Sequence, residues 1–317
     1  GISIRVGWSA LQPSAQEPDF SLIDAQLAMA RKYNKKVSLS IEAGIETPDW
    51  VYSLGARPFS LVLDESAGER VCQRVRMPIP WDPVYLDSFR SLIRAASRRY
   101  NRSSLLTHVK VTGISGIGQA AAVPHAAAQT ISTKTKLCTT TDELAAWLDV
   151  GYSRPRIVQS FRELIELFSQ SFTSHRIAVV VDAKGFPPIG ERGATLSGAA
   201  YDIDIVPELL KLAITGRESR VLIQSNELTN ASTYPFPIQF SEQITIGYQL
   251  RWPVTDDKAA RMNGGTHESP VAVFDGAVRK GVVARARYLE VQPEDIKNPQ
   301  LSSSLAGARV LLRRGSR

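Results

Sequence analysis

The chain has 317 residues, of which 43% are hydrophobic and 22% charged, and these shares are ordinary for a globular protein. No apolar run approaches the roughly 18 residues that cross a bilayer, so we expect no membrane span. The formal net charge is +7. The short basic runs lie at expected helix ends, where the helix dipole favours cations, or at the terminus. They do not cluster with aromatic residues as in nucleic-acid binders, and we expect no nucleic-acid partner.

The cysteine and histidine content limits the chemistry further. Two cysteines, Cys72 and Cys138, are too few for a disulfide framework and leave room for one disulfide. Four histidines without an HxH or HxxxH pair do not indicate a zinc or iron site. We therefore expect no metal and no cofactor. The sequence enters strand-like residues directly after Gly1, so we expect no signal peptide or leader in it, and the compartment stays open.

Eight short strands are expected in chain order, most of them rich in β-branched residues. They cover residues 2–8, 36–44, a stretch within 59–79, 108–114, 176–182, 220–227, 243–249 and 287–291. The fifth strand, 176–182, is a continuous apolar run, which is typical of a strand buried on both faces.

Helical patterns separate these strands. They cover residues 21–33, 47–52, 84–100, 141–149, 155–172, 205–215, 256–261, 270–283 and 299–312. Residues 115–141 lack periodicity, and we predict a long loop over the mouth of the barrel. Eight alternating strand–helix units predict an α/β fold, a (β/α)8 TIM barrel formed as a single domain by residues 1–317. An open doubly wound sheet is the alternative, but it wants a glycine-rich phosphate turn after the first strand, and residues 8–13 are not one.

Barrel chemistry takes place at the carboxyl ends of the strands. The side chains expected there, or directly beside them, are Trp8, Glu42, Trp81, Gln119, Asp182, Glu227, Tyr248, Gln249, Arg251, Trp252 and Glu290. Aromatic rings beside carboxylates suit a sugar, because a pyranose offers flat C–H faces and hydroxyl groups. Cleavage of a glycoside needs two carboxyl groups, roughly 5 Å apart for retention and up to about 9 Å apart for inversion.

Two glutamates are the leading catalytic candidates. Glu227 ends an expected strand after Gln-Ser-Asn, and we take it as the first candidate for nucleophile or base. Glu290 is the second, since its alternation with Leu289 points it into the barrel. We expect the carbohydrate to be lined by Trp8, Trp81, Asp182, Tyr248, Gln249 and Trp252.

Several short segments resemble a known superfamily. They are Val6-Gly-Trp-Ser, Asp19-Phe-Ser-Leu-Ile-Asp24, Lys36-Val-Ser-Leu, Thr47-Pro-Asp-Trp-Val, Pro80-Trp-Asp-Pro and His108-Val-Lys-Val-Thr-Gly. They are similar to the retaining (β/α)8 glycoside hydrolases of the beta-galactosidase and cellulase-like group. The resemblance implies an acid/base glutamate after the fourth strand and a nucleophilic glutamate at the end of the seventh.

At those two positions the chain has amides, Gln119 and Gln249. An amide neither donates a proton of suitable acidity nor acts as a good nucleophile. Three explanations remain open. The strand count can be off by one, which would make Glu227 the seventh-strand nucleophile and Trp252 the aromatic that follows on the eighth. The catalytic pair can have moved to Glu227 and Glu290, on either side of the seventh strand. Or the barrel only binds.

The sequence thus predicts a glycoside hydrolase-like barrel that cleaves O-glycosidic bonds, with Glu227, Glu290 and Gln119 at the catalytic positions. The alternative is a non-catalytic, carbohydrate-binding or structural barrel, favoured by Gln119 and Gln249. Gln119 can be natural or an engineered replacement of a glutamate. The sugar, the linkage, the stereochemical outcome and the oligomeric state stay open.

Overall fold

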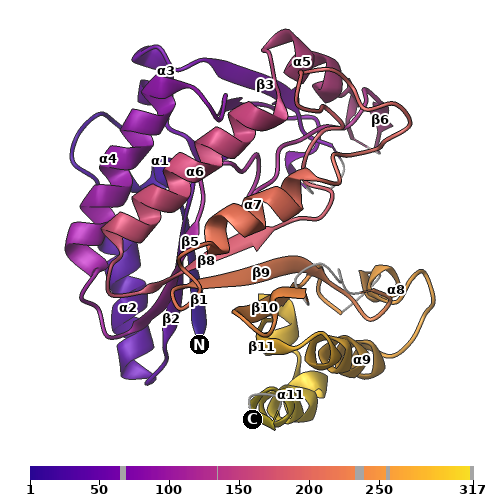
Figure 1. The fold of residues 1–317 in the computed structure, drawn as a ribbon. Helices are drawn as coiled ribbons and strands as arrows, with labels where there is room; N and C mark the ends of the chain where they lie inside the picture. The colour runs from indigo at the N-terminus through magenta and orange to yellow at the C-terminus, as the bar shows by residue number, and fades with distance from the viewer. Residues whose placement is uncertain (65–68, 134, 233–238, 255–257, 315–317) are drawn as a thin grey trace. The chain divides into compact units, whose positions relative to one another are not determined.

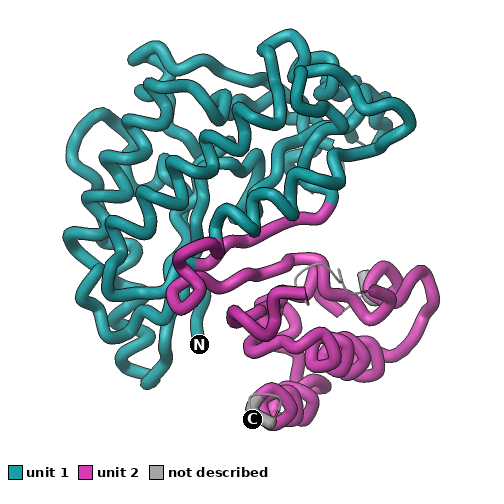
Figure 2. Tube along the Cα trace, viewed as in Figure 1, with its two compact units in different colours: residues 1–177, 184–213 teal, residues 178–183, 214–317 magenta. Residues whose placement is uncertain are grey.

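The computed structural model describes residues 1–64, 69–133, 135–232, 239–254 and 258–314. They form two compact units, one of residues 1–177 and 184–213 and the other of residues 178–183 and 214–317 (Figure 2). Both units contain parallel strands joined through helices, so the predicted α/β class is confirmed. Among the described residues, no helix combines the length and apolar character that a membrane crossing requires.

Three parallel strands form the sheet of the first unit, in the order β1-β2-β5. Their bounds are Ile2–Gly7 for β1, Val37–Glu42 for β2 and Leu106–Val111 for β5. β1 and β2 pair in continuous register from Ile2 opposite Val37 to Gly7 opposite Glu42. Because successive side chains of a strand point to opposite faces, residues paired in register share a face.

The two faces of this sheet differ sharply in polarity. The apolar face consists of Ile4, Val6, Val37, Leu39, Ile41, Val109 and Val111. The polar face consists of Ser3, Arg5, Ser38, Ser40, Glu42, His108 and Lys110, and Thr112 continues it just beyond β5.

The helices of the first unit cover the apolar face, with α2 against β1 and α6 against β5 (Figure 1). α4 packs beside α6, where the rings of Phe89 and Phe168 lie 6.4 Å apart. The helical segments are α1 (Trp8–Leu11), α2 (Ser21–Lys32), η1 (Gly44–Glu46), α3 (Asp49–Ser53), α4 (Pro83–Tyr100), α5 (Glu143–Asp149), α6 (Arg154–Ser171) and α7 (Ile205–Ile214), of which the last ends at the unit boundary.

The third expected strand is not a parallel strand of this sheet. β3 (Pro58–Val62) and β4 (Arg74–Pro78) form an antiparallel hairpin instead, and β2 pairs directly with β5. The sequence alternates here between buried and exposed residues, as in an antiparallel sheet with one solvated face. The short stretch between β3 and β4 is also too short for a helical crossover between parallel strands.

The predicted loop of residues 115–141 is more ordered than expected. It contains a second antiparallel hairpin, β6 (Thr130–Ser132) with β7 (Leu137–Thr139), and a bridge between Ser115 and Ala122. A disulfide joins Cys138 of β7 to Cys72, which precedes β4. Its two cysteines lie 66 residues apart in the sequence. The bond therefore ties the two hairpins together.

Four strands form the sheet of the second unit, in the order β8-β9-β10-β11. β8 (Arg176–Val181) enters the unit at Ala178, and β9 (Val221–Leu228), β10 (Thr245–Leu250) and β11 (Ala286–Glu290) follow. The helical segments are α8 (Lys258–Met262), α9 (Pro270–Val283), α10 (Pro293–Lys297), η4 (Pro299–Leu301) and α11 (Ser302–Arg314).

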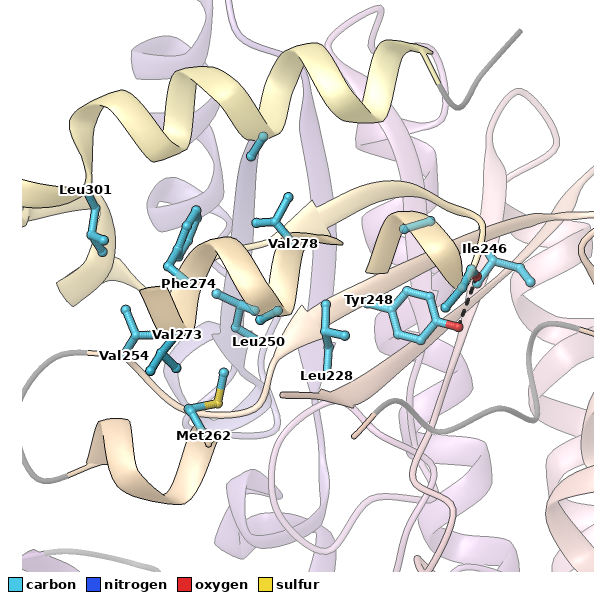
Figure 3. Packing of buried hydrophobic residues seen from close by; sticks show 14 residues of the cluster. Leu228, Ile246, Tyr248, Leu250, Val254, Met262, Val273, Phe274, Val278 and Leu301 are labelled. Atoms are coloured by element: carbon cyan, nitrogen blue, oxygen red, sulfur yellow. Dashed lines mark hydrogen bonds between the residues drawn. The ribbon is translucent and has the colours of Figure 1, made fainter. Parts of the chain in front are cut away.

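A cluster of buried apolar side chains holds these helices on the sheet (Figure 3). Ile246, Tyr248 and Leu250 of β10 contribute one side of it, and Phe274 and Val278 of α9 contribute another. The alternate residues of β10, Thr245, Gly247 and Gln249, point to the opposite face. β10 therefore has one face of large apolar side chains and one face without them, as the strands of the first unit do.

Seven of the eight expected strands are parallel strands of the described chain. The predicted N-terminal strand ends one residue early, because Trp8 begins α1. The predicted helix over 256–261 lies partly outside the described residues. An eight-stranded closed ring formed as a single domain remains a prediction.

The disulfide should contribute strongly to the stability of the first unit. In the chain-entropy account, closing a loop of this length stabilises the folded state by about 4 kcal/mol. We expect a reductant to lower the free energy of unfolding by that order, measured by urea denaturation followed by tryptophan fluorescence. The double variant Cys72→Ser/Cys138→Ser is the control, and it should unfold identically with and without reductant. Equal stability of the reduced and oxidised wild type would contradict the expectation.

Candidate functional site

The predicted site residues divide between the two units. Trp8, Trp81 and Gln119 belong to the first, and Asp182, Glu227, Tyr248, Gln249, Trp252 and Glu290 belong to the second. Within the second unit, Gln249 and Glu290 are register partners on neighbouring strands, and Glu227 stands near the end of β9 on the other side of β10. Asp182 directly follows β8 and is half-buried.

Trp8 is a core residue in this structure and not a ligand platform. Its side chain is fully buried, and its ring lies 5.8 Å from that of Trp50 and 5.4 Å from that of Phe89. Its indole nitrogen donates to Gln12. A ring without exposed surface offers no face to a sugar, which corrects the expectation.

Tyr248 is likewise part of the core. It is fully buried in the apolar cluster of the second unit, and its hydroxyl donates to the carbonyl of Ala284 at 3.3 Å (Figure 3). Burial raises its pKa to about 12. Tyr248 therefore points away from the face that carries Gln249.

The two remaining tryptophans keep some exposed surface. Trp81 is half-buried, and its ring lies 6.0 Å from that of Trp147 and 5.9 Å from that of Tyr152. Trp252 is also half-buried, and the guanidinium of Arg251 stacks 4.5 Å from its ring centre. A sugar-binding role for either tryptophan remains a prediction.

Gln119 is fixed by a buried lysine. Lys110 of β5 has no exposed surface, and its Nζ donates to Oε1 of Gln119 at 2.8 Å. The same Nζ lies 3.5 Å from the hydroxyl of Ser3. Since a buried ammonium needs hydrogen-bond acceptors, the Gln119 amide serves Lys110. The residue after the fourth predicted strand, Gln119, is thus an amide that accepts a hydrogen bond from a buried lysine.

Glu42 is the carboxyl group on the polar face of the first unit. Its Oε1 is buried and makes no hydrogen bond within the described residues. Burial raises its pKa above the ordinary value of 4.5, while the charges of Arg5 and Lys110 act in the opposite direction. This carboxyl group therefore holds its proton to a higher pH than an ordinary glutamate does.

A hydrogen-bonded network lies on the polar face of the second unit. Gln224, fully buried on β9, donates from Nε2 to Oε2 of Glu290 at 3.1 Å and to Oδ1 of Asn226 at 2.8 Å. The hydroxyl of Tyr288 donates to Oε1 of Gln224 at 2.9 Å. Tyr288 and Glu290 of β11 are thus both hydrogen-bonded to Gln224 of β9, across the intervening strand β10.

Glu227 occupies a different local environment. Its Oε2 accepts from the backbone N–H of Ala183 at 2.9 Å, and its Oε1 lies 3.9 Å from the guanidinium of Arg251. The pairing of β9 with β10 shifts register between the partners of Tyr248 and Leu250, which is where Glu227 lies. Such irregularities re-aim side chains near functional sites. The Glu227 side chain remains 12% exposed, so it is accessible.

Sequence reasoning missed Lys110, Gln224 and Tyr288 as site residues, although a signal existed. Lys110 and Gln224 are polar residues in mostly buried strands, and each lies two residues from another polar residue of its strand, His108 and Asn226 respectively. A polar residue inside a buried strand must find a partner, so its presence points to a network. Among the described residues, no group of three or more acidic, histidine or cysteine side chains is placed to hold a metal ion.

No protein-family model matches the sequence, and the search of curated proteins finds no match. Solved structures of glycosidases are similar to the chain at low sequence identity. An endo-glycoceramidase II from Rhodococcus sp. is 10% identical with a TM-score of 0.45, over 91% of this chain and 64% of that one.

Two xylanases are similar to the same degree. An intracellular xylanase from Thermoanaerobacterium saccharolyticum is 13% identical with a TM-score of 0.47, over 89% of this chain and 72% of that one. An endo-1,4-beta-xylanase from Caldicellulosiruptor owensensis is 12% identical with a TM-score of 0.47, over 91% and 77%. These likenesses are remote.

The raised pKa of Glu42 makes a testable contribution to stability. A carboxyl group with a folded-state pKa above its unfolded value stabilises the fold fully below about pH 4.5, and this stabilisation is lost as the pH rises through the folded-state value. We expect Glu42→Gln to flatten the fall of unfolding free energy between pH 4 and pH 7, measured by urea denaturation. Glu17→Gln, at an exposed position, should keep the wild-type profile. Parallel profiles for wild type and Glu42→Gln would contradict the assignment.

Proposed function

We propose that the carboxyl ends of β9, β10 and β11 form a carbohydrate site, at which Glu227 and Glu290 act on an O-glycosidic bond. One observation carries the proposal: the two glutamates stand near the ends of the strands on either side of β10. Strands two apart in a sheet are separated by about 10 Å. Side chains that lean toward each other from that separation fall within the carboxyl spacing that glycoside cleavage uses, roughly 5 to 9.5 Å.

Both glutamates receive hydrogen bonds or a positive charge. Glu290 accepts from the amide of Gln224, while Glu227 accepts from a backbone N–H and lies near Arg251. Donors of this kind favour a carboxylate over a carboxylic acid. The pair is therefore suited to the roles of nucleophile and base.

A pair of carboxylates suits one substrate class best. A leaving group that is stable as an anion departs without protonation, whereas an alkoxide needs a general acid, whose help is typically worth 10²- to 10⁴-fold. Glycosides with acidic leaving groups should therefore be the better substrates.

We expect the protein to cleave dinitrophenyl glycosides faster than mononitrophenyl ones, and methyl glycosides least. Removing a nucleophile or base should cost at least about a hundredfold. Glu227→Gln and Glu290→Gln should thus each lower kcat/KM on a dinitrophenyl glycoside by that factor. The release of nitrophenolate from a panel of sugars, followed by absorbance, measures it.

Glu268→Gln is the matched control, because Glu268 is an exposed glutamate of the same unit. It should retain the wild-type rate. A rate unchanged by both Glu227→Gln and Glu290→Gln would remove the pair from the mechanism.

A second candidate function, carbohydrate binding without cleavage, is favoured by the hydrogen bond between Lys110 and Gln119. Both side chains are buried. Gln119, at the position where the similar family has its acid, therefore binds the amino group of Lys110. A carboxyl group introduced there would pair with Lys110 and stay ionised.

The two candidates differ in the fate of a bound sugar. Binding alone predicts a calorimetric signal with a sugar and no release of product, and Gln119→Glu should add no activity, because Lys110 keeps the new carboxyl group charged. Release of product from that sugar by the wild type would contradict binding alone.

A further inference from the structure

Tyr288 reaches its partner by crossing over a glycine. Tyr288 belongs to β11 and Gln224 to β9, and Gly247 of β10 is the register partner of both. A Cβ atom on Gly247 would stand 2.0 Å from Cζ of the Tyr288 ring. The ring therefore lies flat against β10 where only glycine leaves room. Its hydroxyl then meets Oε1 of Gln224 at 2.9 Å.

The amide of Gln224 is fully used by its neighbours. Its Nε2 has two hydrogens, and one goes to Asn226 and the other to Glu290. Its Oε1 accepts from Tyr288. Because the side chain is fully buried, water does not replace a lost partner without rearrangement.

The acceptors on Glu290 and Asn226 favour one of two amide orientations, and the hydrogen bond from Tyr288 adds to its stability. In the opposite orientation Oε1 would face the carboxylate of Glu290, and two acceptors would meet without a hydrogen between them. That orientation suits only a protonated Glu290. A donor aimed at Oε1 from the other side stabilises the orientation in which Nε2 faces Glu290.

We propose that Tyr288 is a positioning residue, which fixes the Gln224 amide so that Nε2 donates to Glu290 and holds Glu290 as the nucleophile or base of the site. The assignment rests on the proposed function for its catalytic consequence. It distinguishes the two glutamates. Glu290 is hydrogen-bonded to the buried amide of Gln224, whereas Glu227 accepts from a backbone N–H and lies near the exposed Arg251. Gly247 belongs to the same arrangement, because its lack of a side chain makes room for the Tyr288 ring.

The hydrogen-bonding part of the proposal is testable without any substrate. In the full-length protein labelled with ¹⁵N-glutamine, the side-chain NH₂ of Gln224 should exchange with water slowly, since both hydrogens are donated inside the protein. Tyr288→Phe removes the orienting donor and should speed this exchange about fivefold to tenfold. Gly247→Ala displaces the ring by an independent route and should do the same.

Tyr100→Phe is the control, because it also removes a hydroxyl donor, one that bonds Asp24 in the first unit. It should leave the Gln224 exchange rate unchanged. A wild-type amide that exchanges freely, or a Tyr288→Phe amide that exchanges at the wild-type rate, would overturn the proposal.

Kinetics on a dinitrophenyl glycoside test the catalytic part. Tyr288→Phe should lower kcat about tenfold and leave KM unchanged, because the residue orients Glu290 and does not contact the sugar. An unchanged kcat in a protein that cleaves the glycoside would overturn the positioning role. If the exchange results hold and no variant or wild type cleaves any glycoside, the proposed function fails while the hydrogen-bonded device stands.

Discussion

In-register pairing of parallel strands is the constraint on which the rest of this structure depends. Because side chains alternate along each strand, register aligns polar positions with polar ones, and both units acquire one apolar and one polar face. The apolar faces bind the helices. On the polar faces, buried donors such as Lys110 and Gln224 require acceptors, which they find in Gln119 and Glu290. The hydrogen-bonded groups of both units are thus consequences of the same alternation.

Helices and strands whose sequence pattern lies within the segment itself could be predicted from the sequence. Seven strands and the long amphipathic helices lie within a few residues of their expected positions, since an apolar run or a 3.6-residue period is a property of the segment itself. The third strand was misassigned for a physical reason. Phe59 and Leu61 are buried while Pro58 and Ser60 are exposed, and this alternation is typical of an antiparallel hairpin with one solvated face and not of a buried parallel strand.

The site was predictable only in part. Glu227, Gln249 and Glu290 do lie at or near strand ends, because the carboxyl end of a strand can be located from the strand itself; their role as site residues stays a prediction. Aromatic residues gave no such guide, since Trp8 and Tyr248 stand beside strand ends and still turn into the core. Tyr288 was missed because its importance lies in a contact with Gln224, 64 residues earlier in the sequence, across a strand that has no side chain at the crossing point. Contacts of this kind have no local signature.

The link between Cys72 and Cys138 has a consequence for biogenesis. The chain has two cysteines in all, so oxidation within one molecule has a single product and no mispaired isomer exists. During synthesis the first thiol must wait until the second has been made, by which time β1, β2 and β5 are already complete. The crosslink can therefore form only after the residues of all three strands have been synthesised.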